Sequence, residues 1–176
     1  MRVIAGALRG RRLQGPEAFD QSIRPTADRA REALFSILQQ WPSGGFLELC
    51  AGTGAVGVEA WSRGYGPVTC VEREAKALAI LVANIKGTDI KVLSRDIRRL
   101  TPEAFHGLAV IFVDPPYEES PDLWLHLAPR MRDWLVPEGI LVWETDRRTE
   151  LVKSEGWDLI NSRQYGAARF HFLQTT

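Results

Sequence analysis

From residue 46 to residue 143, short apolar runs rich in β-branched residues alternate with segments of helical periodicity. Apolar runs joined by helices are typical of a mostly parallel sheet that is covered on both faces. They predict strands at 46–50, 68–71, 90–93, 108–113 and 140–143. Two later runs, 157–162 and 168–173, flank Tyr165-Gly166 and predict an antiparallel hairpin at one edge. The sequence therefore predicts an α/β fold.

Helical periodicity predicts one helix before the first strand and three between the strands. The first follows Arg24-Pro25-Thr26, with Thr26 as its N-cap and Asp28 at the positive end of its dipole. Its apolar face holds Ala30, Leu34, Ile37, Leu38 and Trp41. The others are predicted at 55–63, around an apolar face of Leu78, Leu81, Val82 and Ile85, and at 121–136, where Pro129 should break or kink the helix.

The N-terminal residues are basic although the chain as a whole has no formal net charge. Residues 1–15 hold four arginines and no acid, so they carry +4 and the remainder carries −4. The pattern around Gly6 and Gly10 predicts a short β-hairpin, followed by a linker, so we divide the chain into 1–23 and 24–176. A basic arm on an acidic domain is typical of polyanion binding, but a solvated charged terminus fits the charges equally well. Arginine favours phosphate, so we predict RNA contacts at Arg2, Arg9, Arg11, Arg12 and Arg24. For Arg24, helix capping or support of the cofactor side is an equal alternative.

Both cysteines, Cys50 and Cys70, lie in apolar runs and are expected to be buried thiols. This favours a reducing, cytoplasmic setting. No apolar run approaches the length of a membrane span, and nothing resembles a signal peptide. We therefore predict a cytoplasmic protein that does not bind membranes.

A glycine-rich loop follows the first predicted strand. Gly52, Gly54 and Gly57 would let the backbone approach a ligand, and the next helix would present free N–H groups to it. Glu72 lies twenty residues after Gly52, at the end of the second strand, where a carboxylate accepts hydrogen bonds from ribose hydroxyls. Loop and acid together predict an adenosine-containing cofactor.

Two such cofactors are NAD and S-adenosylmethionine, and the acidic residues around the loop indicate which of them fits better. Glu48 would repel a pyrophosphate, but it suits the cationic amino group of a methionine tail. Asp96 could accept from an adenine amino group, with Ile97 packing on the ring. Glu48 as a strand-end surface acid and Asp96 as a helix cap remain alternatives. A parallel sheet that ends in a hairpin also favours a Rossmann-like methyltransferase over a dehydrogenase.

The fourth predicted strand ends abruptly at Asp114-Pro115-Pro116-Tyr117. Two prolines cannot continue a strand, so the chain turns at the sheet edge where ligands of α/β proteins bind. The Asp114 carboxylate and the Pro115 carbonyl could accept both hydrogens of an exocyclic amino group and leave its lone pair free for methylation. Tyr117 could stack on the base, which must be unpaired or flipped to reach the site. Asp114 is also a route for the leaving proton, before or after methyl transfer.

This tetrapeptide is similar to the motif of methyltransferases that act on amino groups of nucleobases, and the whole chain resembles the bacterial 16S rRNA guanine-N2 methyltransferases of the RsmD type. The resemblance is carried by Arg2-Val3-Ile4-Ala5-Gly6, Arg24-Pro25-Thr26-Ala27-Asp28-Arg29, Ala51-Gly52-Thr53-Gly54 and the terminal hairpin. It implies a Rossmann-like class I methyltransferase that uses S-adenosylmethionine and acts on 16S rRNA in a small-subunit assembly particle, with no obligate protein partner. The expected cofactor residues are Thr26, Glu48, Gly52, Gly54, Glu72, Asp96 and Ile97.

Three other functions remain open from the residues alone. A DNA or RNA adenine-N6 methyltransferase is one of them, and the DNA enzyme is disfavoured because the chain has no room for a separate target-recognition domain. An NAD-dependent oxidoreductase would leave Asp114-Pro115-Pro116-Tyr117 without a purpose. A non-catalytic RNA-binding module is disfavoured by the acids at 48, 72, 96 and 114. The three histidines lack ligand-like spacing, so no metal is expected.

Overall fold

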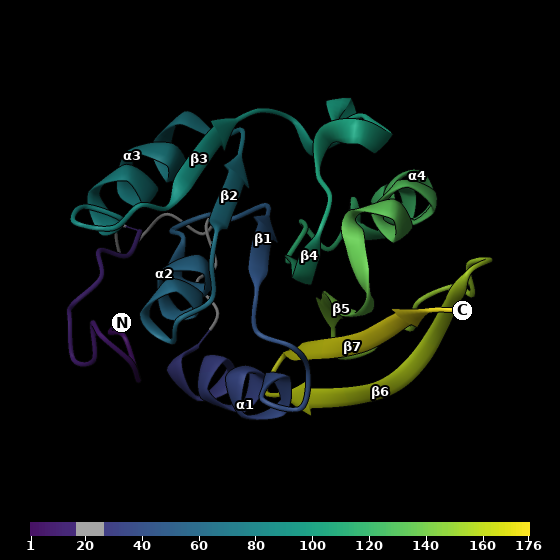
Figure 1. Ribbon diagram of the computed structural model, residues 1–176, viewed down its shortest axis with the longest axis horizontal. Coiled ribbons are helices and arrows are strands. Elements are labelled where there is room, and N and C mark those ends of the chain that lie inside the picture. The colour runs from purple at the N-terminus through teal and green to yellow at the C-terminus, as the bar shows by residue number, and fades with distance from the viewer. Residues whose placement is uncertain (17–26) are drawn as a thin grey trace.

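The apolar runs of the sequence form the centre of a seven-stranded sheet in the computed structural model, which describes residues 1–16 and 27–176 (Figure 1). The strand order is β3-β2-β1-β4-β5-β7-β6. Strands β1 to β5 are parallel, and β7 runs antiparallel to both β5 and β6. The strands are β1 (Gly45–Leu49), β2 (Val68–Glu72), β3 (Lys91–Ser94), β4 (Leu108–Val113), β5 (Leu135–Asp146), β6 (Trp157–Tyr165) and β7 (Ala168–Thr175). The predicted Rossmann-like sheet with a C-terminal hairpin is confirmed.

The helices cover both faces of this sheet. They are α1 (Asp28–Leu38), α2 (Ala55–Ser62), α3 (Ala75–Asn84) and α4 (Ser120–Met131), with short 3-10 turns at 97–99, 102–104 and 132–134. Alternate strand residues point to opposite faces. Phe46 and Val110 pack in one core with α1, α2 and α3, whereas Leu47 and Ile111 pack in the other with α4. This two-sided burial explains why the strands read as continuous apolar runs.

Four details differ from the sequence-based expectations. The last predicted helix ends at Met131 rather than 136, and Pro129 is accommodated inside it. The fifth strand is longer than predicted and runs from Leu135 to Asp146. Val82, expected on the apolar face of α3, is 50% exposed. The residue at the N-cap of α1 is Ala27, which has no side-chain capping bond, whereas Thr26 lies outside the described residues.

The N-terminal hairpin is small and is fastened to the sheet domain. Its two arms meet in one antiparallel bridge between Arg2 and Arg12. The side chain of Glu59, on α2, is fully buried and accepts hydrogen bonds from the backbone N–H groups of Ile4 (2.8 Å) and Ala5 (3.0 Å). Val3 and Leu13 are buried in the core shared with α1 and α2. The division at residue 23 stays a prediction, but residues 1–13 pack as part of the domain.

Within the described residues, no helix is both long and apolar enough to cross a bilayer. Those residues also contain no group of three His, Cys, Asp or Glu side chains placed to hold a metal ion.

Candidate active site

A pocket of about 720 Å³ opens at the carboxyl ends of the parallel strands. This volume lies in the range of small-molecule sites, and the position is where ligands bind in open α/β sheets. The pocket extends from the ends of β2 and β3, past the glycine-rich loop, to the ends of β4 and β5 and the β6–β7 turn. It brings together Gly52, Glu72, Ile97, Asp114, Pro115 and Tyr117 from the predicted site residues.

The glycine-rich loop is shaped by left-handed backbone conformations. Cys50, Gly52 and Gly54 all have positive φ, at 57°, 53° and 72°. A Cβ on Gly54 would lie 2.0 Å from Leu81 Cδ1, so α3 packs against the loop at a distance that only glycine permits. Gly54 therefore shapes the loop from behind, whereas Gly52 lines the pocket directly.

Glu72 holds the loop and the start of α3 together. One carboxylate oxygen accepts from Gly52 N (2.7 Å), and the other accepts from the backbone N–H groups of Arg73 (2.7 Å) and Glu74 (2.9 Å). A carboxylate offers about four acceptor positions, so one remains for a ligand hydroxyl. This arrangement suits the predicted contact with a ribose, which stays a prediction.

Glu48 lies below the loop and does not line the pocket. It is only 3% exposed, and its Oε2 accepts from Gly57 N (2.9 Å) and lies 3.3 Å from Cys70 Sγ. It is therefore not the strand-end surface acid considered as an alternative. Burial raises the pKa of Glu48 to about 8 although the bonds from Gly57 and Cys70 oppose this shift. A carboxyl that is mostly neutral at pH 7 offers little charge to an ammonium group, so direct contact with a methionine tail stays a prediction.

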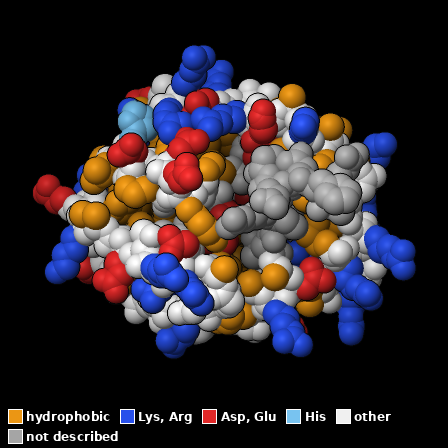
Figure 2. All heavy atoms as spheres, turned by 180° about the vertical axis from the view of Figure 1, so that it is seen from behind, with side chains coloured by type: hydrophobic (Ala, Val, Ile, Leu, Met, Phe, Trp, Pro, Cys, Tyr) orange, Lys and Arg blue, Asp and Glu red, His pale blue; other side chains and the backbone are white. Residues whose placement is uncertain are grey.

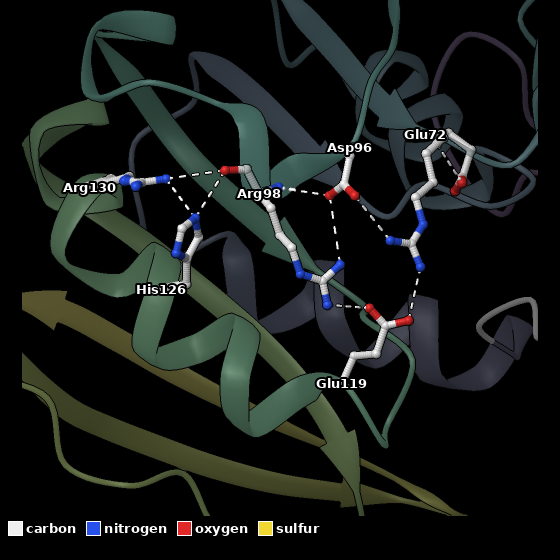
Figure 3. Close-up of polar contacts among 7 residues, drawn as sticks. Glu72, Asp96, Arg98, Glu119, His126 and Arg130 are labelled. Atoms are coloured by element: carbon white, nitrogen blue, oxygen red, sulfur yellow. Dashed lines mark hydrogen bonds and ion pairs between the residues drawn. The ribbon is translucent and has the colours of Figure 1, made fainter.

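Asp96 belongs to a ring of alternating charges beside the pocket (Figure 3). Arg73 bridges Asp96 (3.2 Å) and Glu119 (2.9 Å), and Arg98 pairs with the same two carboxylates at 3.8 and 2.5 Å. Asp96 also accepts from Arg98 N (2.9 Å) and so caps the 3-10 turn at 97–99. This agrees with the alternative prediction that Asp96 is a helix cap. The bond from Arg98 N and the pairing with Arg73 lower the pKa of Asp96. The ring ties the ends of β2 and β3 to the chain that follows Tyr117.

The turn after β4 places its functional groups at the pocket. Asp114 N donates to Leu49 O (3.3 Å), which continues the β1–β4 pairing one residue beyond the strand. Pro115 is buried, whereas Asp114 and Tyr117 are half-buried and line the pocket. A carboxylate and an aromatic ring therefore face the same cavity as the glycine-rich loop.

Sequence reasoning missed several lining residues, among them Glu144 and Tyr165. Glu144, on β5, is 4% exposed and its carboxylate is hydrogen-bonded to the Tyr117 side chain. Tyr165, at the end of β6, lines the pocket beside the β6–β7 turn. The signal for Glu144 was available, because it directly follows the apolar run 140–143 as Asp114 follows 108–113.

Four of the predicted RNA-binding arginines, Arg2, Arg9, Arg11 and Arg12, lie on the N-terminal hairpin, away from the pocket lining. Arg2, Arg9 and Arg12 are exposed and Arg11 is half-buried. Arg24 lies outside the described residues. In Figure 2, Lys and Arg side chains lie mainly around the rim of the face, including the side where the N-terminal residues lie. Their contact with RNA stays a prediction.

The residues at the pocket fit S-adenosylmethionine. Glu72 retains an acceptor position for a ribose, and Ile97 offers an apolar side chain at the end of β3. A pyrophosphate, by contrast, would meet the acids at 72 and 114, and only Gly52 of the three loop glycines lines the cavity. Two arginines of the lining, Arg73 and Arg98, are already paired with Asp96 and Glu119. Fold and site together define a Rossmann-like methyltransferase, whose cofactor is S-adenosylmethionine.

The chain belongs to the family described as Conserved hypothetical protein 95, whose sequence profile matches residues 1–174. It is 34% identical to YlbH of Bacillus subtilis, which is named as a candidate rRNA methyltransferase, over 93% of this chain and 92% of that one. It is 28% identical to the ribosomal RNA small subunit methyltransferase D of Haemophilus influenzae, over 99% and 93% of the two chains. The structure of the candidate methyltransferase YhhF of Escherichia coli superposes with a TM-score of 0.84 at 26% identity, covering 99% and 97%. The resemblance to the RsmD type is confirmed.

Proposed function

We propose that the protein transfers a methyl group from S-adenosylmethionine to the exocyclic N2 of a guanine in small-subunit rRNA. The observation that supports this most strongly is that Asp114, Pro115 and Tyr117 line the same pocket as Gly52 and Glu72. An acceptor pair for an amino group thus lies in one cavity with a cofactor loop. The small-subunit rRNA methyltransferases D that the chain is similar to support the choice of substrate.

S-adenosylmethionine supplies an electrophilic methyl group, whose bond to sulfur breaks with the electron pair staying on sulfur. The protein's task is to make the amino nitrogen a usable nucleophile. The guanine N2 lone pair is delocalised into the ring. Acceptance of both N2 hydrogens, by the Asp114 carboxylate and the Pro115 carbonyl, favours a more tetrahedral nitrogen whose lone pair forms the new N–C bond. The nitrogen then sheds one proton, for which Asp114 is the nearby base.

Positioning and electrostatics account for most of the expected acceleration. Positive charge develops on N2 during the transfer, and a fixed carboxylate in a partly dry site stabilises that charge. Tyr117, which lines the pocket, would stack on the base and fix its angle of approach. The ring of Arg73, Asp96, Arg98 and Glu119 holds the segment after Tyr117 against the cofactor half of the pocket.

The deciding experiment uses small-subunit rRNA and assembled subunits from cells that lack this protein, incubated with labelled S-adenosylmethionine. We expect label in the RNA and N2-methylguanosine in the nucleoside digest. Binding of S-adenosylmethionine and of NAD is measured in parallel by calorimetry, and only the former should bind. N6-methyladenosine in the digest would overturn the assigned base, and binding of NAD alone would overturn the class.

The arginines of the N-terminal hairpin should contribute through phosphate contacts. Changing Arg9, Arg11 and Arg12 together to glutamine is expected to weaken RNA binding at low salt. The slope of log affinity against log salt should become shallower by about 0.7–0.9 for each contact that is lost. Fluorescence anisotropy at several salt concentrations measures this slope. Lys153→Gln, on the segment between β5 and β6, is a control for the loss of a single positive charge away from the hairpin. An unchanged slope in the triple variant would exclude the hairpin from RNA binding.

A further inference from the structure

We propose that Glu144 is a specificity-determining residue of the base pocket, whose carboxylate accepts the N1–H of the target guanine beside Asp114. The inference rests on the proposed function and deepens it. It assigns a role to a buried carboxylate that the transfer chemistry described above does not use.

Strand register places the two carboxylates side by side. Val113 on β4 pairs with Trp143 on β5 in a parallel ladder. Asp114 and Glu144 are the next residue on each strand, so they follow the last pair at the same level. Neighbouring strands lie about 4.8 Å apart, and residues in register point to the same face. Both side chains line the pocket. A planar base that presents its N2 to Asp114 would therefore present an adjacent edge atom to Glu144.

Within the described residues, the surroundings of Glu144 leave one of its carboxylate oxygens without a hydrogen-bond donor. The carboxylate is hydrogen-bonded to the Tyr117 side chain, and the residue is 4% exposed. Its Oε2 is buried and has no hydrogen-bond partner within residues 1–16 and 27–176. A buried polar atom without a hydrogen-bond partner is destabilising, and more so when it is charged. On the antiparallel side Glu144 is opposite Phe170, which offers no polar group. A ligand N–H is what this oxygen lacks.

Guanine has the edge that matches this pair of carboxylates. It carries two hydrogens on N2 and one on the neighbouring N1, so the edge presents three donors. Asp114 and the Pro115 carbonyl account for the two on N2, which leaves N1–H for Glu144. Adenine has an unprotonated N1 beside its amino group, and that lone pair would face the ionised carboxylate. Burial and the charge of Asp114 raise the pKa of Glu144, so the discrimination should be strongest at high pH, where the carboxyl has lost its proton. Sites that hydrogen-bond a substrate N–H reject analogues that lack it by large factors, because their buried groups are left unpaired. Positive charge arising on N2 also makes N1–H a better donor, so the contact strengthens during the reaction.

The first test changes the RNA base, so that the N1 hydrogen of the target guanine is removed. Once the target guanosine has been mapped, 2-aminopurine is placed at that position by RNA ligation, and the RNA is assembled into particles if particles are the substrate. This base keeps the exocyclic N2 amine but has an unprotonated N1. Wild-type protein is expected to methylate it with kcat/KM at least about 10²-fold below that for guanine.

Glu144→Gln is the complementary variant. Its amide can donate to the unprotonated N1 of 2-aminopurine, so the ratio of kcat/KM for 2-aminopurine to that for guanine should rise by at least about tenfold. This ratio cancels any uniform loss of activity. Glu138→Gln, an exposed change on the same strand, should leave the ratio unchanged.

The outcomes separate the two hypotheses. If wild-type protein methylates guanine N2 but uses 2-aminopurine equally well, the role of Glu144 is refuted and the proposed function stands. That result needs no variant, so it holds even if Glu144→Gln fails to fold. An unchanged ratio in a folded Glu144→Gln protein that binds S-adenosylmethionine refutes it as well. Absence of guanine-N2 methylation by the wild-type protein refutes the proposed function itself.

Discussion

Asp114→Asn protein is expected to bind S-adenosylmethionine as tightly as the wild type and to transfer its methyl group about 10²–10⁴-fold more slowly. Asparagine keeps the shape of the side chain and one acceptor oxygen, but it removes the negative charge that stabilises the developing cation and the base that receives the proton. The backbone bond from Asp114 N to Leu49 O does not depend on the side chain, so the turn should persist. Single-turnover transfer of labelled methyl measures the rate, and calorimetry measures cofactor affinity.

Two comparisons make this result specific to the site. Asp158→Asn, an exposed change on β6, has the same chemistry and should leave the transfer rate unchanged. Asp114→Ala should be at least as slow as Asp114→Asn, because it also lacks the acceptor oxygen. Transfer at the wild-type rate by either Asp114 variant would remove this residue from the mechanism.

Glu48→Gln is expected to remove the contribution of Glu48 to the pH dependence of stability. Burial raises the pKa of Glu48 to about 8 in the folded protein, whereas an unfolded chain has the ordinary value of 4.5. Between these values the folded protein holds a proton that the unfolded chain has released. The free energy of unfolding therefore falls as pH rises from 4.5 to 8, and the contribution of Glu48 is constant outside that window. At about 1.4 kcal/mol per pKa unit, the loss is on the order of a few kcal/mol.

Urea unfolding at pH 5 and pH 9 measures this effect. The amide is neutral at both values and can still accept from Gly57 N, so the variant should be more stable than wild type at pH 9 and similar at pH 5. Glu144 also has its pKa raised, by burial and by the charge of Asp114. Comparison of variant with wild type isolates Glu48, because Glu144 is present in both. Equal pH dependence in the two proteins would show that Glu48 ionises normally.

Much of the fold could be predicted from local sequence patterns, because each of these patterns is compatible with only one kind of element. A run such as 108–113, apolar throughout, has to be buried on both faces, and Pro115-Pro116 has to end it. The glycine-rich loop and Glu72 were recognisable because their spacing follows from the strand, turn and helix between them. The wrong limit at residue 136 came from extending a helical pattern through residues that form a 3-10 turn.

The rest depended on contacts between distant segments. The ring of Arg73, Asp96, Arg98 and Glu119 joins the ends of β2 and β3 to the start of α4, and charge alone gives no sign of that pairing. Glu48 lies inside a strand that is buried on both faces, so its side chain is buried as well. Its position in the sequence does not tell whether the carboxylate can reach a ligand. Glu144 follows its apolar run as Asp114 does, but its place beside Asp114 depends on the register of β4 and β5, which the sequence alone does not give.

The contacts between α2 and the N-terminal residues limit which variants can be used to measure the contribution of this region to RNA affinity. Removing residues 1–13 would strip Glu59 Oε2 of its donor Ile4 N and expose the apolar surface that Val3 and Leu13 now cover. We expect such a shortened protein to lose several kcal/mol of stability, visible as a lower melting temperature. If the shortened protein bound RNA weakly, the cause could be partial unfolding as much as the loss of positive charge. Point changes that keep the backbone in place are therefore the informative way to probe this end of the protein.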